Sequence, residues 1–442
     1  MTASPRYAVR LGAVLAAGVL LRVWTILAIP TRPVSDFFGY FEVARNLVAT
    51  GRYETEPGVP DARRSPAYPL LLSLAFRGAP EGSALAGAKL INLALFVLAG
   101  LAGAQLARRL WGDGAGLWTA AILAFLPRSV LMADLLAAEN LLAPLLLTYL
   151  LLCAGSWTGA FSAQRVAGLG VLAGVLCLTR AVFYFVPLVW LAGALAGRLG
   201  RKRIWRELLL MLVVAHAVLL PWAIRNGRVF GRFTPFNLVG GVGIFIANNS
   251  NATGQWYAWP QDIERLRPGV LARGDVAIDD AARAEAGRWI REHPGLAARA
   301  YLRRLGIILK DDAFAAEFAI FARSIPHRGG PLAVLPEGHP LERCRGLVHA
   351  ILRISGALLA AAALGGFWLL VRAARKGSLR DRTLAAGLLA AALYVPLFSA
   401  VMAVNGRYRW APEDAIAPVA GLFISSLTAG SRLRSRGPEK SR

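Results

Sequence analysis

Long apolar runs constrain this chain more than any other feature, because about 18 apolar residues suffice for a helix to cross a membrane. Such runs, some of them short or interrupted, recur at 11–29, 85–107, 115–133, 141–154, 166–179, 181–197, 207–224, 347–371, 383–404 and 415–428. Hydrophobic residues make up 56% of the 442-residue chain, more than soluble domains usually contain. The sequence therefore predicts an all-α polytopic membrane protein with roughly ten transmembrane helices.

The basic residues indicate how the chain is oriented. If the N-terminus is cytoplasmic and the spans alternate, the short cytoplasmic loops collect clusters of arginine and lysine at 6–10, 108–109, 198–206, 372–382 and 431–442. This is the positive-inside pattern, and long loops such as 225–345 translocate whatever their charge. The net charge of +24 is therefore explained by membrane topology, and we predict no nucleic-acid partner.

This topology divides the chain into four parts. Residues 1–224 form an N-terminal transmembrane catalytic module that includes a first extracytoplasmic loop at 30–83. Residues 225–345 form a large extracytoplasmic loop, and residues 346–430 form the C-terminal transmembrane helices. The basic segment 431–442 is then a cytoplasmic tail.

Both extracytoplasmic loops contain patterns typical of amphipathic helices. In the first loop, apolar residues recur at helical spacing at Phe37, Phe41, Ala44 and Val48, with Asp36 in the first turn. In the second loop, a narrow apolar stripe runs among charged residues at Ala282, Ala286, Trp289 and Ile290. We expect these juxtamembrane helices to lie on the outer membrane surface.

Ionisable residues gather at the predicted outer ends of the spans. The acids are Asp36 and Glu139, and the arginines are Arg64, Arg180, Arg225 and Arg407. An ionisable residue at membrane depth is costly and suggests function, although an arginine at a span end can also extend to lipid head groups. For Asp36 the alternative is a simple first-turn charge that the helix dipole stabilises. Because these residues converge on one face, we expect a common pocket.

Carboxylates and arginines at a membrane boundary suit an anionic, lipid-linked substrate. Arginine binds phosphate through its bidentate fork, and a carboxylate can accept the proton of an acceptor hydroxyl. A polyprenyl-phosphate sugar fits these requirements, and direct displacement would invert its anomeric centre. The sequence contains no glycine-rich nucleotide loop, so it gives no support for a nucleotide-sugar donor.

Six segments, in this order along the chain, resemble motifs of the GT-C membrane glycosyltransferases. They are "SDFFGYFEVARNLVATGRY", "RSPAYPLLL", "AENLLAPLLL", "LTRAVFYFVPL", "LLPWAIRNGRVFGRFTPFNLVGGVGIFIANNSNATG" and "GRYRWAPEDAIAP". The resemblance is to the family 39 branch, which includes the protein O-mannosyltransferases and the lipid A aminoarabinose transferase. The chain departs from the branch pattern at Ser65 and Ala67, which replace Pro and Gly, and at Ala181, which replaces Pro.

The resemblance implies a GT-C-like bundle and transfer of a sugar from a polyprenyl-phosphate donor to a lipid, glycan or protein acceptor. It places the active site outside the cytoplasmic membrane, facing the periplasm or exterior, and the large excess of arginine over lysine indicates a bacterial source. By the resemblance, Asp36 is the first-loop catalytic aspartate and Glu139 the second acidic residue. Donor-phosphate contacts would come from Arg64, Arg225 and Arg407, and we add Arg180 from the same predicted face.

Two other function classes fit the same features. A transporter or flippase for lipid-linked sugars needs the basic pocket but no catalytic base, and a polysaccharide polymerase or ligase would use a different donor. No cofactor is predicted with certainty. Asp36 and Glu139 can share a divalent cation, and a metal-free site is equally compatible with the sequence. The three cysteines and five histidines show no zinc spacing.

Overall fold

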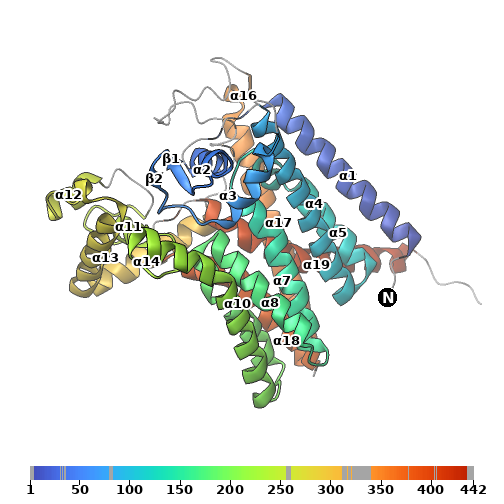
Figure 1. Ribbon diagram of the computed structural model, residues 1–442. Coiled ribbons are helices and arrows are strands. Elements are labelled where there is room, and N and C mark those ends of the chain that lie inside the picture. Colours follow the sequence, from blue (N-terminus) through green and yellow to red (C-terminus); the bar gives the residue numbers. More distant parts are fainter. Residues whose placement is uncertain are drawn as a thin grey trace, which may run out of the picture.

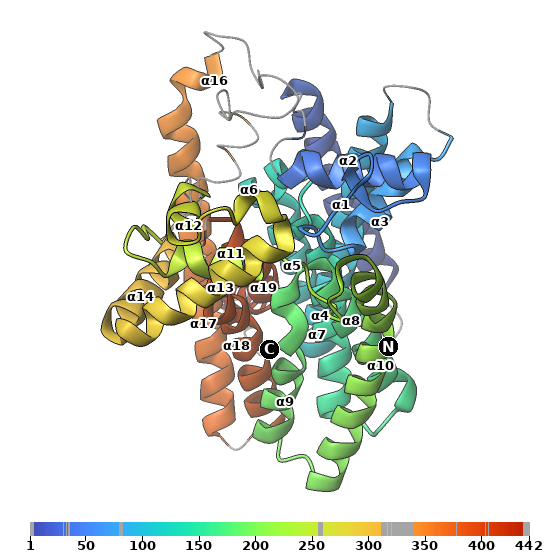
Figure 2. The same cartoon turned by 60° about the vertical axis from the view of Figure 1, so that its left-hand side comes forward.

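The structure is a computed structural model. It describes residues 4–29, 31, 33, 36–78, 83–254, 260–310, 316, 320, 340–376, 378–402, 404 and 406–435. The basic tail predicted at 431–442 lies outside the described residues from position 436 onward. Long helices form a bundle, and one end of this bundle is covered by shorter helices and loops (Figures 1 and 2).

Helices long and apolar enough to cross a membrane confirm a multi-pass membrane protein. In the described part of the chain, six helices meet this criterion. They are α1 (Pro5–Ala28), α4 (Ala84–Trp111), α7 (Glu139–Thr158), α10 (Arg201–Phe230), α17 (Arg345–Arg375) and α18 (Leu379–Ser399). The bundle also contains the shorter α5 (Asp113–Phe125), α8 (Ala163–Thr179) and α9 (Pro187–Ala196), and the long α19 (Trp410–Ser435). The number of roughly ten crossings stays a prediction.

The bundle core shows why small residues recur in these apolar helices. The indole of Trp157 from α7 lies where a Cβ at Gly193 of α9 or at Gly387 of α18 would collide with it, at 2.4 and 2.1 Å. Its Nε1 donates a hydrogen bond of 2.8 Å to the carbonyl oxygen of Trp190. Close helix approach at small residues is a common way to pack helices in membranes.

The segment that the sequence predicts as the first extracytoplasmic loop forms a small layer over the bundle. It contains α2 (Asp36–Thr50), the strands β1 (Glu54–Glu56) and β2 (Val59–Pro60), α3 (Ala67–Leu72) and the 3₁₀ helix η1 (Ser73–Phe76). The predicted amphipathic helix is confirmed, since Phe37 and Ala44 of α2 are buried. The antiparallel hairpin β1–β2 was not anticipated. Its turn contains Gly58 at φ +81°, a conformation that favours glycine.

The second segment is also helical. It contains α11 (Gly240–Ala247), α12 (Pro260–Leu266), η3 (Leu271–Arg273), α13 (Asp275–Glu292), α14 (Pro294–Lys310) and α16 (Pro340–Arg343). The apolar stripe of α13 behaves differently from the expectation, because Ala282 and Ala286 are fully buried against α11 in a cluster with Phe245 and Ile246. These alanines therefore pack inside the protein and do not face a membrane. The remaining short helices are α6 (Pro127–Met132), η2 (Ala181–Phe185) and η5 (Gly406–Arg409).

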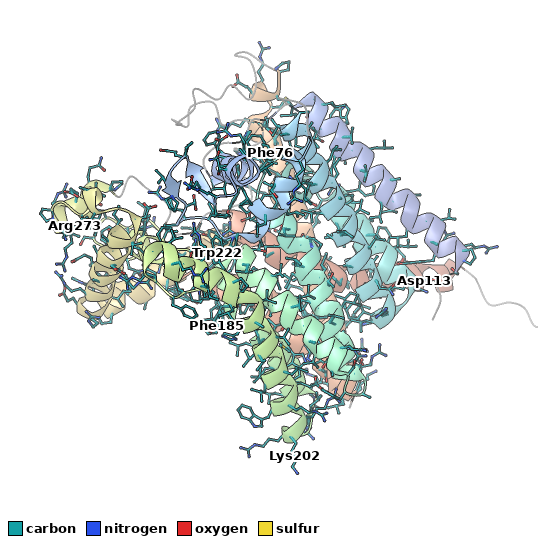
Figure 3. The ribbon with its side chains drawn as sticks, viewed as in Figure 1. Phe76, Asp113, Phe185, Lys202, Trp222 and Arg273 are labelled. Atoms are coloured by element: carbon teal, nitrogen blue, oxygen red, sulfur yellow. The ribbon has the colours of Figure 1, made fainter. Side chains whose placement is uncertain are left out.

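The basic loop that contains Lys202 lies at the end of the bundle opposite the predicted extracytoplasmic segments. Figure 3 shows Lys202 at one end of α10, and Trp222 and Arg273 toward the other. We expect a single cysteine at Arg273 to react with a membrane-impermeant maleimide added from outside, and one at Lys202 to stay unlabelled. Both variants need a background in which Cys153, Cys177 and Cys344 are replaced by alanine. Labelling of Lys202 and not Arg273 would reverse the topology.

Candidate active site

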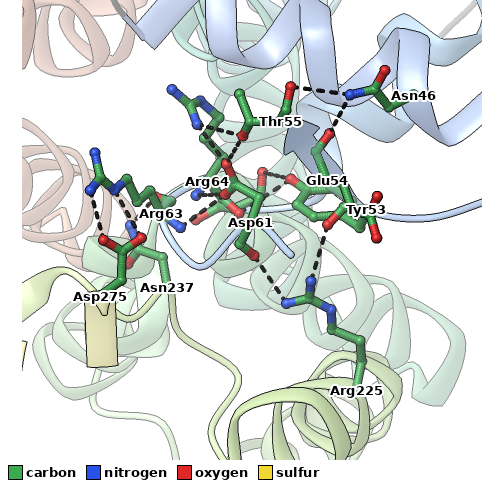
Figure 4. A network of polar contacts seen from close by, with 11 residues as sticks. Asn46, Tyr53, Glu54, Thr55, Asp61, Arg63, Arg64, Arg225, Asn237 and Asp275 are labelled. Carbon is green, nitrogen blue, oxygen red and sulfur yellow. Dashed lines mark hydrogen bonds and ion pairs between the residues drawn. The ribbon is translucent and has the colours of Figure 1, made fainter. Parts of the chain in front are cut away.

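Asp61 organises the segment that follows the first-loop hairpin. Its Oδ1 accepts hydrogen bonds from the backbone N–H groups of Arg63 and Arg64, at 2.9 and 2.7 Å. Its Oδ2 accepts from the hydroxyl of Thr55 and from Nη1 of Arg64, the latter at 2.5 Å. Figure 4 shows this network. Because Asp61 is buried and bonds both backbone and side chain, it fixes the direction of the Arg64 guanidinium.

Arg64 lies over the first turns of α2. Its guanidinium occupies the space beside Gly39, where a Cβ would come within 1.8 Å of Cζ. Burial by itself lowers the pKa of Arg64, but the carboxylates of Asp61 and Asp36 raise it above its usual value. Arg64 is thus charged, and Asp36 is near enough to act on it electrostatically.

A cavity of about 280 Å³ opens beside this arginine. Its wall is built by both extracytoplasmic segments and by the ends of bundle helices. The lining includes Asp36, Tyr40, Arg63, Arg64, Ser65, Thr179, Arg180, Asn237, Gly240, Gly243, Asp275, Ser399 and Tyr408. Three of the predicted site residues, Asp36, Arg64 and Arg180, therefore line one cavity.

An ion pair with Glu139 fixes the position of the Arg180 guanidinium. Arg180 caps the C-terminal end of α8, and its Nη2 donates to Oε1 of Glu139 at the start of α7. The Arg180 guanidinium also lies over the ring of Tyr408, 5.1 Å from its centroid. Glu139 is buried and lines a different, smaller cavity of about 40 Å³. Its nearest acidic neighbour in sequence, Asp134, is instead paired with Lys89 at 2.5 Å.

Arg225 lies outside the 280 Å³ cavity. Its guanidinium donates to the backbone carbonyls of Asp61 and Tyr53, at 3.1 and 3.2 Å, and contacts the rings of Tyr53, Trp222 and Phe230. It lines a separate, mostly apolar groove beside α8 and α10. The arginine thus ties the end of α10 to the first loop. Arg407 lies in η5, and its side chain is outside those that the structure describes.

Several cavity residues were missed by sequence reasoning. Tyr40 and Tyr408 lie within motifs in which the sequence predicted a role for Asp36 and Arg407, and no role was predicted for either tyrosine. Asn237 and Asp275 come from the second extracytoplasmic segment, and no pattern in the sequence links them to the first. The run "NLVGGVG" also contributes to the lining, through Asn237, Val239, Gly240, Val242 and Gly243.

The side chains present do not resemble a preformed metal site. Among the residues that the structure describes, no group of three or more His, Cys, Asp or Glu side chains could hold a metal ion. Asp36 lines the larger cavity, whereas Glu139 is bonded to Arg180 and lines the smaller one. The donor set of the larger cavity is instead suited to an anion beside a carboxylate.

Gly39 provides a sharp test of this geometry. In the interior of an ordinary helix, replacing Gly by Ala stabilises the folded protein by roughly 0.5–1 kcal/mol. Here we expect Gly39→Ala to displace the Arg64 guanidinium and weaken binding of a polyprenyl phosphate about tenfold or more, the value of a charge-assisted contact. The control is Gly306→Ala in α14, where a Cβ meets nothing within 4 Å. Equal phosphate-lipid affinity in both variants and in the parent chain would show that the position of Arg64 is irrelevant to binding.

No protein-family model and no curated protein matches the sequence. Several solved structures match the fold of this chain. The archaeal oligosaccharyltransferase AglB from Archaeoglobus fulgidus, in complex with an inhibitory peptide and a dolichol-phosphate, matches with a TM-score of 0.58 and 18% identity. The match covers 99% of this chain and 52% of AglB. An oligosaccharyltransferase from Archaeoglobus fulgidus in the apo form matches with a TM-score of 0.56 and 16% identity, over 97% of this chain and 51% of that one.

A further match is ArnT from Cupriavidus metallidurans bound to undecaprenyl phosphate, with a TM-score of 0.45 and 15% identity. It covers 100% of this chain and 82% of ArnT. The chain spans about half the length of the oligosaccharyltransferase it matches. The likeness to AglB, at 18% identity, shows the fold: this chain folds like that oligosaccharyltransferase over almost its whole length.

Proposed function

We propose that this chain is an integral membrane glycosyltransferase that moves a sugar from a polyprenyl-phosphate-linked donor to a hydroxyl acceptor. The observation that carries the proposal is the single cavity in which Asp36 lies together with Arg64 and Arg180. The AglB structure, which shares the fold, contains a dolichol-phosphate, and this supports a lipid-phosphate ligand for the cavity here. The acceptor is a lipid, a glycan or a protein.

The proposed reaction is a single displacement at the anomeric carbon. The Asp36 carboxylate takes the proton of the acceptor hydroxyl, and the acceptor oxygen forms a bond to that carbon. The bond from the anomeric carbon to the phosphate oxygen breaks, and polyprenyl phosphate leaves with the electron pair. Arg64 and Arg180 stabilise the charge that develops on the leaving phosphate. The acceptor attacks opposite the leaving group, so the configuration inverts.

Other predicted residues take supporting roles in this proposal. Glu139, first assigned as a second catalytic acid, orients Arg180 through their ion pair. Arg225 acts through the first loop, because it bonds the carbonyl of Asp61, whose side chain fixes Arg64. Arg407 is kept as a candidate phosphate contact, since its neighbour Tyr408 lines the cavity.

We further propose that the enzyme resides in a bacterial cytoplasmic membrane, with the cavity facing the periplasm or exterior. The transferred group is a hexose or a pentose. The positive-inside distribution of arginine and lysine in the short loops supports this orientation.

Proteoliposomes separate the transferase from a flippase for lipid-linked sugars. The purified protein is supplied with a synthetic undecaprenyl-phosphate sugar and an envelope extract as the source of lipid, glycan and protein acceptors. A transferase releases undecaprenyl phosphate and transfers the sugar label to an acceptor. Movement of intact donor between leaflets, with no release, would support the flippase and contradict this proposal.

A further inference from the structure

An ion pair joins the two extracytoplasmic segments at the cavity wall. Arg63 donates from Nε and Nη2 to the two carboxylate oxygens of Asp275, at 3.0 and 2.7 Å (Figure 4). Both residues line the 280 Å³ cavity, although they are 212 positions apart in the chain. This bidentate geometry is the one that arginine also uses to bind phosphate.

The other two arginines described in the cavity have buried partners. Arg64 is paired with Asp61 and Arg180 with Glu139, and these carboxylate side chains are only 2% and 6% exposed. By contrast, the side chains of Arg63 and Asp275 are 58% and 31% exposed. An exposed ion pair contributes little stability and is readily exchanged, whereas separating a buried pair strands a charge. The Arg63–Asp275 pair is therefore the easiest of the three to open.

Opening this pair leaves the two segments joined. The backbone N–H of Leu238 donates to the carbonyl of Ala62 at 2.7 Å. The side-chain amide of Asn237 donates to the carbonyl of Arg63 at 2.9 Å. Asp275 also lies in the first turn of α13, where the helix dipole stabilises a carboxylate without a cationic partner. The ion pair is thus dispensable for the fold at this point.

We propose that Arg63 is a further phosphate-binding arginine of the cavity, and that Asp275 is a competing carboxylate which the phosphate of a lipid-linked ligand displaces. The proposal rests on the function proposed above and adds the residue that changes partner on binding. The Arg63 side chain exchanges one bidentate anion for another, so its charge stays compensated in both states. Asp275 lowers the affinity for the phosphate and so favours release of the polyprenyl phosphate product.

Replacing Arg63 and replacing Asp275 should change the affinity for phosphate in opposite directions, although the two residues form one ion pair. Arg63→Gln removes a phosphate contact and is expected to weaken binding about tenfold. Asp275→Asn removes the competitor and is expected to tighten binding roughly twofold to fivefold, the range in which exposed ion pairs contribute. A pair that only stabilised the fold would give the same direction for both variants.

The test is equilibrium binding of farnesyl phosphate to the full-length protein in detergent, with farnesol as the uncharged probe. The matched controls are Arg232→Gln and Asp280→Asn, which break an exposed pair within the second segment that does not line the cavity. Thermal melts of all variants check folding. We expect opposite shifts for the Arg63 and Asp275 variants, no shift for the controls and no effect on farnesol.

The outcomes separate the two proposals. Failure of the parent protein to bind farnesyl phosphate more tightly than farnesol would overturn the phosphate-binding cavity, and with it the role of Arg63. Binding by the parent protein with equal or same-direction effects of Arg63→Gln and Asp275→Asn would overturn only the exchange proposed here. Shifts of the same size in the control pair would also overturn it, since they would reflect net charge alone.

Discussion

Replacing Asp36 by asparagine is expected to lower the rate of sugar transfer by roughly a hundredfold or more, the usual contribution of a positioned general base. Asparagine keeps the size of the side chain but cannot take a proton from the acceptor. Asp36 is the first residue of α2 and lines the cavity beside Arg64. The variant should therefore fold and still bind a phosphate lipid. Single-turnover transfer by purified protein measures the effect.

The competing interpretation makes Asp36 only a first-turn charge. Loss of a favourable interaction with the helix dipole costs roughly 0.3–1 kcal/mol of stability and leaves turnover nearly intact. The matched control is Asp381→Asn, since Asp381 also lies in the first turn of a helix but does not line the cavity. Near-normal transfer by a well-folded Asp36→Asn protein would remove the base from the mechanism.

Arg180→Gln is expected to weaken donor binding about tenfold to a hundredfold, because a charge-assisted contact to phosphate contributes roughly 1.5–3 kcal/mol. Glu139→Gln should act in the same direction by releasing the Arg180 guanidinium from its partner. Because both changes act through one ion pair, the double variant should be little worse than Arg180→Gln alone. Titration with undecaprenyl phosphate measures these affinities.

Arg165→Gln is the control for loss of a packed arginine. Arg165 lies in the first turn of α8, at the end opposite Arg180, and donates to the carbonyls of Gly155 and Ala160. The Arg165→Gln substitution should lower the melting temperature of the protein without changing its affinity for the donor. Additive losses in the Glu139 and Arg180 variants would instead mean that Glu139 contacts a substrate independently.

The sequence predicted the parts of the site that local patterns encode. The spacing of Phe37 and Ala44 gave the amphipathic helix that begins at Asp36, and the apolar run before Arg180 placed that arginine at a helix end. These features depend on residues within a few turns of one another. The same local reasoning gave a bundle of apolar helices.

What the sequence could not predict depends on contacts between distant segments. Arg225 was expected at a phosphate, but backbone carbonyls of the first loop lie within its reach and take its hydrogen bonds. The stripe of α13 was assigned to a membrane surface because amphipathicity does not reveal which apolar partner covers it, and here α11 covers Ala282 and Ala286 of that stripe. The pairing of Arg63 with Asp275 likewise needs the folded chain.

We propose that the residues of this cavity catalyse cleavage of the bond between a sugar and polyprenyl phosphate. The most direct measurement is mass-spectrometric detection of undecaprenyl phosphate released from synthetic hexosyl and pentosyl donors in the presence of an envelope extract. We predict release by the parent protein with one of these donors, and a loss of roughly a hundredfold or more in Asp36→Asn. No release from any donor by well-folded protein, or equal release by Asp36→Asn, would contradict the account.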